Sequence, residues 1–161
     1  MPTTRDDHYW MSQALDLARE AITLDPDDVP VGALILQSQG DRQVFISSGT
    51  NKKQKELDAS AHAEIVALRL AGQALDSWRL QDTTLYTTLE PCPMCAEAIL
   101  QARVSRVVFG AYDQVSGALG SAFNLYTKRI YPIPEVVGGI MEQECAEVLR
   151  EIFAKRRERN A

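Results

Sequence analysis

Residues 83–95 read Thr83-Thr84-Leu85-Tyr86-Thr87-Thr88-Leu89-Glu90-Pro91-Cys92-Pro93-Met94-Cys95. The first seven residues, with four threonines beside Leu85 and Tyr86, are typical of a β-strand. Pro91 ends that strand, and Pro93 suits the first turn of a helix that we expect to reach about residue 102. The stretch therefore predicts a strand that leads directly into a helix with two cysteines at its beginning.

The rest of the chain predicts further strands and helices around this unit. Apolar residues recur at helical spacing over 7–23, 61–70 and 142–159. Runs of strand-forming residues occur at 31–36, 44–47, 104–110 and 136–137, and a turn at 38–41 joins the first two into a hairpin. A hairpin followed by strands and helices in alternation predicts a three-layer α/β/α fold, with helices on both faces of a mixed five-stranded sheet.

Length and composition limit the possible functions. A chain of 161 residues suits a single domain spanning 1–161, here with a basic helix end at about 154–161. No apolar run approaches the roughly 20 residues of a membrane helix. Residues 1–7 carry charges where a signal peptide is apolar, so we expect a cytoplasmic protein with no membrane partner. The net charge of −5 argues against a general polyanion binder but allows a local basic patch.

The three cysteines and two histidines indicate a metal site rather than a set of disulfides. Cys92 and Cys95 share one face of a helix N-terminus, which favours the zinc-binding thiolate. His62 begins the helix at 61–70, and its side chain can point toward the same strand ends. Two thiolates and one neutral imidazole predict one Zn²⁺ per subunit with an open fourth position, the pattern of a catalytic site.

Glu64 lies two residues after His62, close enough to reach the open position without ligating the metal. A carboxylate there can accept a proton from water and return it to a substrate nitrogen. Taken alone, the Cys92-x-x-Cys95 pair also fits a redox protein or half of a structural zinc site without hydrolytic activity. A structural site needs a fourth ligand, but Cys145 lies on an apolar helical stripe and is better explained as core, and His8 as a surface or capping residue.

These residues resemble the zinc signature of the cytidine deaminase superfamily, and so imply a cytidine deaminase-like fold. Wider matches are similar to its branch of bacterial tRNA adenosine deaminases, and the resemblance covers about residues 7–158. The matching stretches are Val29-Pro30-Val31-Gly32-Ala33, Gly49-Thr50-Asn51, His62-Ala63-Glu64, Thr88-Leu89-Glu90, Pro91-Cys92-Pro93-Met94-Cys95, Arg106-Val107-Val108-Phe109-Gly110-Ala111, Asp113, Ser116-Gly117-Ala118-Leu119-Gly120-Ser121 and Glu144-Cys145-Ala146.

The resemblance implies hydrolytic deamination of adenosine to inosine at the wobble position of a tRNA anticodon, by a homodimer that binds the anticodon stem-loop. Zinc-activated water would attack C6 of the base, and Glu64 would deliver a proton to N1. The resemblance also implies substrate contacts by Asn51, the Ala63 backbone, Asp113 and Phe153. Without it, Asn51 is a turn residue, Asp113 a loop acid and Phe153 a core aromatic.

Two features favour tRNA over a free base as the substrate: the 110–121 loop and the basic C-terminal cluster. Deaminases of a free base such as guanine share the Pro-Cys-Pro-Met-Cys form and are the nearest alternative, whereas the 110–121 loop is of the tRNA-deaminase type. Residues 126–132 depart from the Asn-His pair that these relatives carry before the last strand. A phosphate contact could come from the C-terminal cluster of Lys155, Arg156, Arg157 and Arg159, although a charged helix end is more often only solvated.

Overall fold

The computed structural model describes residues 7–161 as five helices and five strands. In chain order these are α1 (Asp7–Leu24), β1 (Gly32–Gln39), β2 (Arg42–Thr50), α2 (Lys53–Glu56), α3 (Ala63–Leu75), β3 (Thr83–Leu89), α4 (Pro93–Gln101), β4 (Arg106–Ala111), β5 (Glu135–Val137) and α5 (Glu142–Arg159). None of the helices within this range is both long and apolar enough to cross a membrane.

The strands form one mixed sheet in the order β2-β1-β3-β4-β5. β1 pairs antiparallel with both β2 and β3, whereas β3, β4 and β5 run parallel. Gly40, in the turn between β1 and β2, has a φ of 66°, which glycine adopts without steric cost. The five-stranded mixed sheet and the hairpin predicted from the sequence are confirmed.

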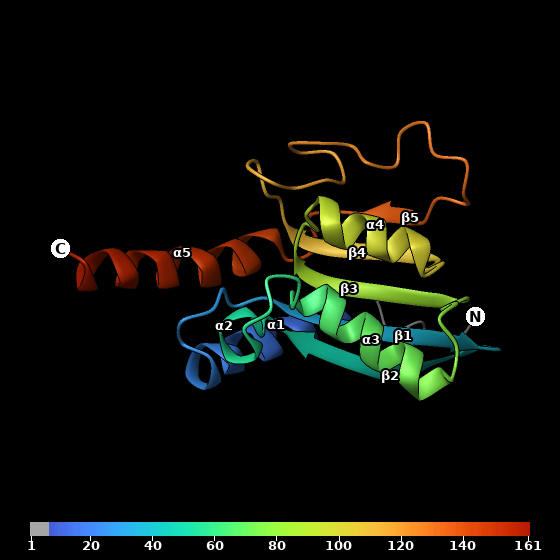
Figure 1. Cartoon of the computed structure of the whole chain (residues 1–161), viewed down its shortest axis with the longest axis horizontal. Coiled ribbons are helices and arrows are strands. Elements are labelled where there is room, and N and C mark those ends of the chain that lie inside the picture. Colours follow the sequence, from blue (N-terminus) through green and yellow to red (C-terminus); the bar gives the residue numbers. More distant parts are fainter. Residues whose placement is uncertain (1–6) are drawn as a thin grey trace.

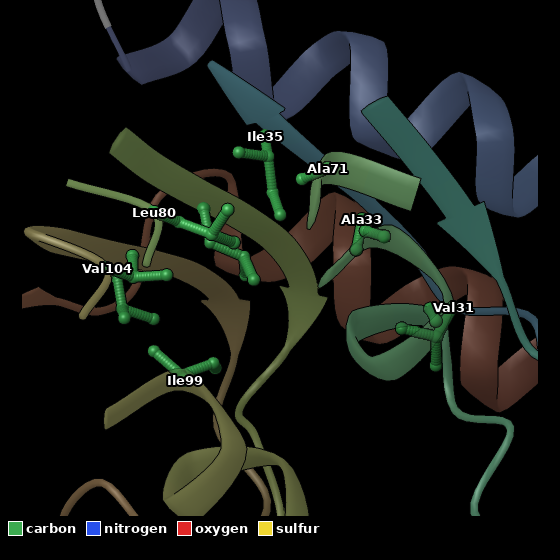
Figure 2. Packing of buried hydrophobic residues seen from close by; sticks show 11 residues of the cluster. Val31, Ala33, Ile35, Ala71, Leu80, Ile99 and Val104 are labelled. Atoms are coloured by element: carbon green, nitrogen blue, oxygen red, sulfur yellow. The ribbon is translucent and has the colours of Figure 1, made fainter. Parts of the chain in front are cut away.

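Alternation along the three central strands creates two cores, one on each face of the sheet. Figure 1 shows α3 and α4 in front of the sheet and α1 behind it. Leu85 and Val107 face α3 and α4, while their neighbours Tyr86 and Val108 face α1 and α5. Figure 2 shows the first of these cores, where Ile35 of β1, Ala71 of α3 and Ile99 of α4 gather. Because both faces of the sheet are buried, these strands have apolar residues at successive positions. Helices therefore cover both faces of the sheet, and the three-layer α/β/α arrangement predicted from the sequence is confirmed.

Two local features differ from the sequence expectation. α3 continues through Gly72 to Leu75 and ends where Asp76 adopts the left-handed conformation at φ 49°. A glycine inside a helix weakens it by only about 1 kcal/mol, which packing of α3 on the sheet offsets. The short helix α2 has no apolar periodicity and was not expected from the sequence.

Candidate metal centre and active site

The ligand residues stand at the N-termini of two helices on the same face of the sheet. His62 is the residue before α3, and Cys92 is the residue before α4, where Pro93 takes the first helical position. β3 ends at Leu89 and leads into Cys92. Gly49 of β2 allows a close approach of α3, since a Cβ there would lie 2.5 Å from the Ala63 carbonyl oxygen. The two helices therefore begin next to each other (Figure 1).

The ligand atoms of His62, Cys92 and Cys95 all lie within 4.8 Å of one another. His62 Nδ1 is 3.6 Å from Cys92 Sγ and 3.5 Å from Cys95 Sγ. Tetrahedral zinc, with bonds of about 2.0 Å to nitrogen and 2.3 Å to sulfur, requires an N–S separation of about 3.5 Å. The three side chains therefore fit zinc in spacing as well as in donor chemistry. Within residues 7–161 the cluster has no fourth member, so the structural-zinc alternative lacks its last ligand.

The protonation of the three ligands is coupled. A hydrogen bond from the Cys95 thiol is the main cause that lowers the pKa of Cys92 to about 4, and His62 contributes in the same direction. That hydrogen bond, together with burial, raises the pKa of Cys95. Its hydrogen bond with Cys92 raises the pKa of His62. Because thiolates and neutral imidazole are the ligand forms, metal binding here must displace protons from the cluster.

Glu64 lies beside this cluster and is only 4% exposed. Burial is the main cause that raises its pKa. Thr87 opposes that effect by donating from Oγ1 to Glu64 Oε1 at 2.8 Å. The other carboxylate oxygen, Oε2, lies 3.4 Å from Cys95 Sγ. A carboxyl group that holds a proton readily and lies next to the ligands without joining them has the position of a proton carrier.

A cavity of about 450 Å³ opens onto the cluster. Asn51 lines it and is largely buried. Its Oδ1 accepts from the Ala63 N–H at 2.8 Å, while no described residue accepts from its Nδ2. That amide group is therefore available to a ligand. Ala63, expected to orient the base through its backbone, does not line the cavity, and its N–H is already bonded to Asn51.

Asp113 and Phe153 also line the cavity, at its rim. The Asp113 carboxylate accepts from the backbone N–H groups of Val115 and Ser116 at 3.0 and 3.1 Å, which shapes the loop after β4. Phe153 is 42% exposed, so its interpretation as a core aromatic is wrong. Cys145, by contrast, is 1% exposed and belongs to the core as expected.

Several residues of the cavity wall were not expected from the sequence. The wall brings a cation, an acid and aromatic and aliphatic side chains from separate segments to one place. They are Val29, Val31, Lys53, Leu89, Glu90, Tyr112, Gln114, Val115, Ser116 and Leu149. Lys53, two residues after Asn51, and Glu90, two residues before Cys92, are close enough to the motifs to have been candidates. Of the others, Val29, Val31, Leu89 and Ser116 lie in stretches that resemble the family, although the resemblance gave them no role.

The basic cluster at the end of α5 divides into two pairs. Arg156 donates from Nη2 to the carbonyl oxygens of Pro26 and Asp28, and Arg159 approaches Asp27 at 4.0 Å. These two arginines thus face the segment between α1 and β1. Lys155 and Arg157 are exposed.

Comparison with known proteins places this geometry in a family. Residues 4–111 match the model of the cytidine and deoxycytidylate deaminase zinc-binding region. The tRNA-specific adenosine deaminase of Haemophilus influenzae is 42% identical over 153 residues, covering 94% of this chain and 86% of that protein.

Two solved structures resemble the chain over most of its length. One, from work on A-to-I editing by tRNA:A34 deaminases at the wobble position of transfer RNA, has a TM-score of 0.78 and 38% identity, covering 88% of this chain and 99% of that one. A guanine deaminase from Nitrosomonas europaea has a TM-score of 0.75 and 27% identity, covering 92% and 85%. The chain belongs to the cytidine and deoxycytidylate deaminase family of zinc-binding proteins.

Proposed function

We propose that this protein converts adenosine to inosine at the wobble position of a tRNA anticodon, with release of ammonia. The observation that carries the proposal is the position of Glu64, between a zinc-compatible cluster and a cavity of about 450 Å³. The names of the similar adenosine deaminases support tRNA as the substrate. The rim formed by Asp113 and Phe153 supports a substrate larger than one base.

Zinc, when bound by His62 and the two cysteines, supplies a Lewis acid that makes water a nucleophile near neutral pH. Glu64 accepts the first proton from water and delivers it to N1 of the purine while the water oxygen bonds to C6. Glu64 then carries the second proton to the amino group, and the C6–N6 bond breaks. The products are inosine, with the first proton on N1, and ammonia, so Glu64 returns to its starting state.

Recognition of the base falls to the chain's own polar groups. Asn51 Nδ2 is free to donate to a purine nitrogen, because Oδ1 is already fixed by Ala63. Lys53 brings a positive charge to the cavity wall, where a phosphate beside the flipped nucleotide can lie. Asp113 can accept from a sugar hydroxyl, and Phe153 can stack on the flanking nucleotide. Lys155, Arg157 and Arg159 are the exposed members of the basic cluster, and of these Arg159 approaches an acid, Asp27.

The proposal extends to the assembly. Residues 1–161 would form one domain holding one zinc ion, and two copies would form a homodimer acting on cytoplasmic tRNA. A shallow depression of about 700 Å³ along α3 and the end of α4 supports a protein contact, since Leu68 and Trp78 both line it and Trp78 is 62% exposed. Light scattering of the purified protein measures whether it is a dimer.

One assay on three substrates tests the proposed activity. An anticodon stem-loop with adenosine at the wobble position, free adenosine and free guanine are each incubated with the zinc-loaded protein, and ammonia release is measured. We expect the stem-loop to be deaminated far faster than either small molecule. If guanine is the best substrate, the protein works as the guanine deaminase of similar fold does, and the tRNA proposal is wrong.

A further inference from the structure

A second buried carboxylate, that of Glu90, lies between the end of β3 and Cys92. Glu90 is 2% exposed, and its backbone N–H donates to the carbonyl oxygen of Ala111 at the end of β4 at 2.9 Å. The chemistry proposed above makes no use of this side chain. A buried charge is unfavourable unless hydrogen bonds satisfy it, so its partners indicate its task.

All side-chain partners of Glu90 come from one loop, residues 113–121. Oε1 accepts from the backbone N–H of Asp113 at 3.2 Å and from the hydroxyl of Ser121. Oε2 accepts from the backbone N–H groups of Leu119 and Ser121 at 3.0 and 3.1 Å. This loop contains no helix or strand. The Glu90 carboxylate therefore accepts from backbone N–H groups of the loop, as the carbonyl groups of a neighbouring strand would do in a sheet.

The loop also leaves no free space around this carboxylate. A Cβ on Gly117 would lie 2.4 Å from Glu90 Cδ and 2.5 Å from Oε2. It would also lie 2.5 Å from the Asp113 carbonyl oxygen. Only a residue without a side chain allows the loop to close on Glu90 in this way. Two separate features, the hydrogen bonds and the glycine contact, thus fix the loop against the same group.

The first half of this loop forms part of the cavity rim. Asp113, Gln114, Val115 and Ser116 line the cavity, and Val115 is 86% exposed. Residues at the rim meet what lies beside the base, whereas Glu64 and Asn51 meet the base itself. The shape of the loop should therefore affect the binding of neighbouring nucleotides more than the chemical step.

We propose that Glu90 is a positioning residue that holds the 113–121 loop as a rim for a polynucleotide, and so sets the preference for a nucleotide within RNA over a free base. This inference rests on the proposed tRNA activity. A different role, in which Glu90 only supports the Cys92 helix, predicts loss of zinc and of turnover instead. The two roles differ in which kinetic constant changes.

The test compares Glu90→Gln with Gly117→Ala, which disturbs the same contact from the loop side. A glutamine nitrogen cannot accept from an N–H, so Glu90→Gln loses at least one hydrogen bond to the loop. Loss of a hydrogen bond to a charged group changes an equilibrium constant by about ten-fold or more. We expect KM for the stem-loop to rise by about that factor in both variants. We expect kcat and bound zinc to stay near those of the parent. Glu135→Gln makes the same substitution at an exposed residue outside the cavity and serves as the control.

Hydrogen–deuterium exchange gives a readout that needs no substrate. Peptides covering 113–121 should exchange faster in both variants, while peptides of β3 and β4 should not change. Unchanged loop exchange, loss of zinc, or a fall in kcat at constant KM would overturn the inference. If the unsubstituted protein deaminates guanine and not the stem-loop, the proposed activity and the RNA preference are both wrong. Hydrogen–deuterium exchange of the 113–121 peptides then still shows whether Glu90 holds the loop in place.

Discussion

The hydrogen bond between Thr87 and Glu64 allows a quantitative test of the proton carrier. Thr87 lies fully buried on β3 and donates to Glu64 Oε1 at 2.8 Å. Valine has nearly the same shape as threonine but lacks the hydroxyl group. Thr87→Val therefore removes a bond to a charged acceptor while leaving the packing nearly unchanged.

The size of the effect follows from the bond that is lost. A hydrogen bond to a charged group contributes about 1.5–3 kcal/mol, which corresponds to a factor of about 10–150 in rate. If the bond keeps Glu64 ionised and directed at the reacting water, kcat should fall by about this factor. Zinc content should not change, because Thr87 contacts none of the three ligands in the bonds that the structure shows.

Single-turnover deamination of the stem-loop at saturating enzyme measures this loss directly. Thr84→Val, on the same strand but half-buried and without a bond to Glu64, is the matched control and should react at the parent rate. A Thr87→Val protein with parent turnover and full zinc would refute the reasoning, because another group would then have to orient Glu64.

Three further changes test other parts of the molecule. Metal analysis should find about one zinc per chain in the parent and much less in Cys92→Ser, and full activity after complete metal removal would contradict the assignment. Alanine at Lys155 and Arg157 should weaken stem-loop binding and reduce the slope of its salt dependence by about one unit per lost contact; superimposable binding curves would show that this end of α5 is only solvated. Asp7→Asn should lower the free energy of unfolding by about 1–3 kcal/mol at pH 7, since Arg106 holds the Asp7 carboxylate through two bonds of 2.7 Å and lowers its pKa. That difference should begin to shrink as the pH falls below about 4 and disappear once the pH is below the lowered pKa of the Asp7 carboxyl group, and a difference that persists there would point to packing instead.

The sequence was sufficient for features that depend on local pattern. α5 begins and ends at the predicted residues: its apolar stripe runs from Cys145 to Phe153, and no glycine or proline interrupts residues 142–159. The metal ligands could be found because each lies at a helix start marked by its own short motif. Their meeting within 4.8 Å required only that the two helices begin on the same face of the sheet.

Side-chain environments at the edge of the fold could not be predicted in the same way. Phe153 continues the apolar stripe of α5, but the last turns of that helix extend beyond the sheet (Figure 1), so the side chain lines a cavity instead of a core. Arg156 has the sequence context of a phosphate contact, yet it donates to carbonyl oxygens of Pro26 and Asp28, residues about 130 positions earlier. Contacts between segments so distant in sequence leave no periodic signal in one chain.

The two buried glutamates near the cysteines offer the sharpest separation of roles. Both are almost inaccessible, at 4% for Glu64 and 2% for Glu90, and both allow the same exchange of a carboxylate for an amide. Both line the cavity, but their partners differ: the Glu90 oxygens accept from loop donors, whereas Glu64 lies beside the metal ligands, and its burial raises its pKa. Glu64→Gln should retain zinc and fold but lose about 10²–10⁴-fold or more in kcat, as expected when a proton carrier is removed.

Glu90→Gln should instead act on KM, because its oxygens hold the rim and do not exchange protons with the substrate. The two variants, measured side by side with the same stem-loop, therefore provide controls for each other. Equal losses of kcat in both variants would mean that removing either carboxylate disturbs the cysteine-bearing segment in the same way, and the two glutamates would then not have separate roles. A loss of kcat in Glu64→Gln alone, with a raised KM in Glu90→Gln alone, would show that Glu64 acts in the chemical step and that Glu90 shapes the binding site. Their different hydrogen-bond partners would then account for the difference in role.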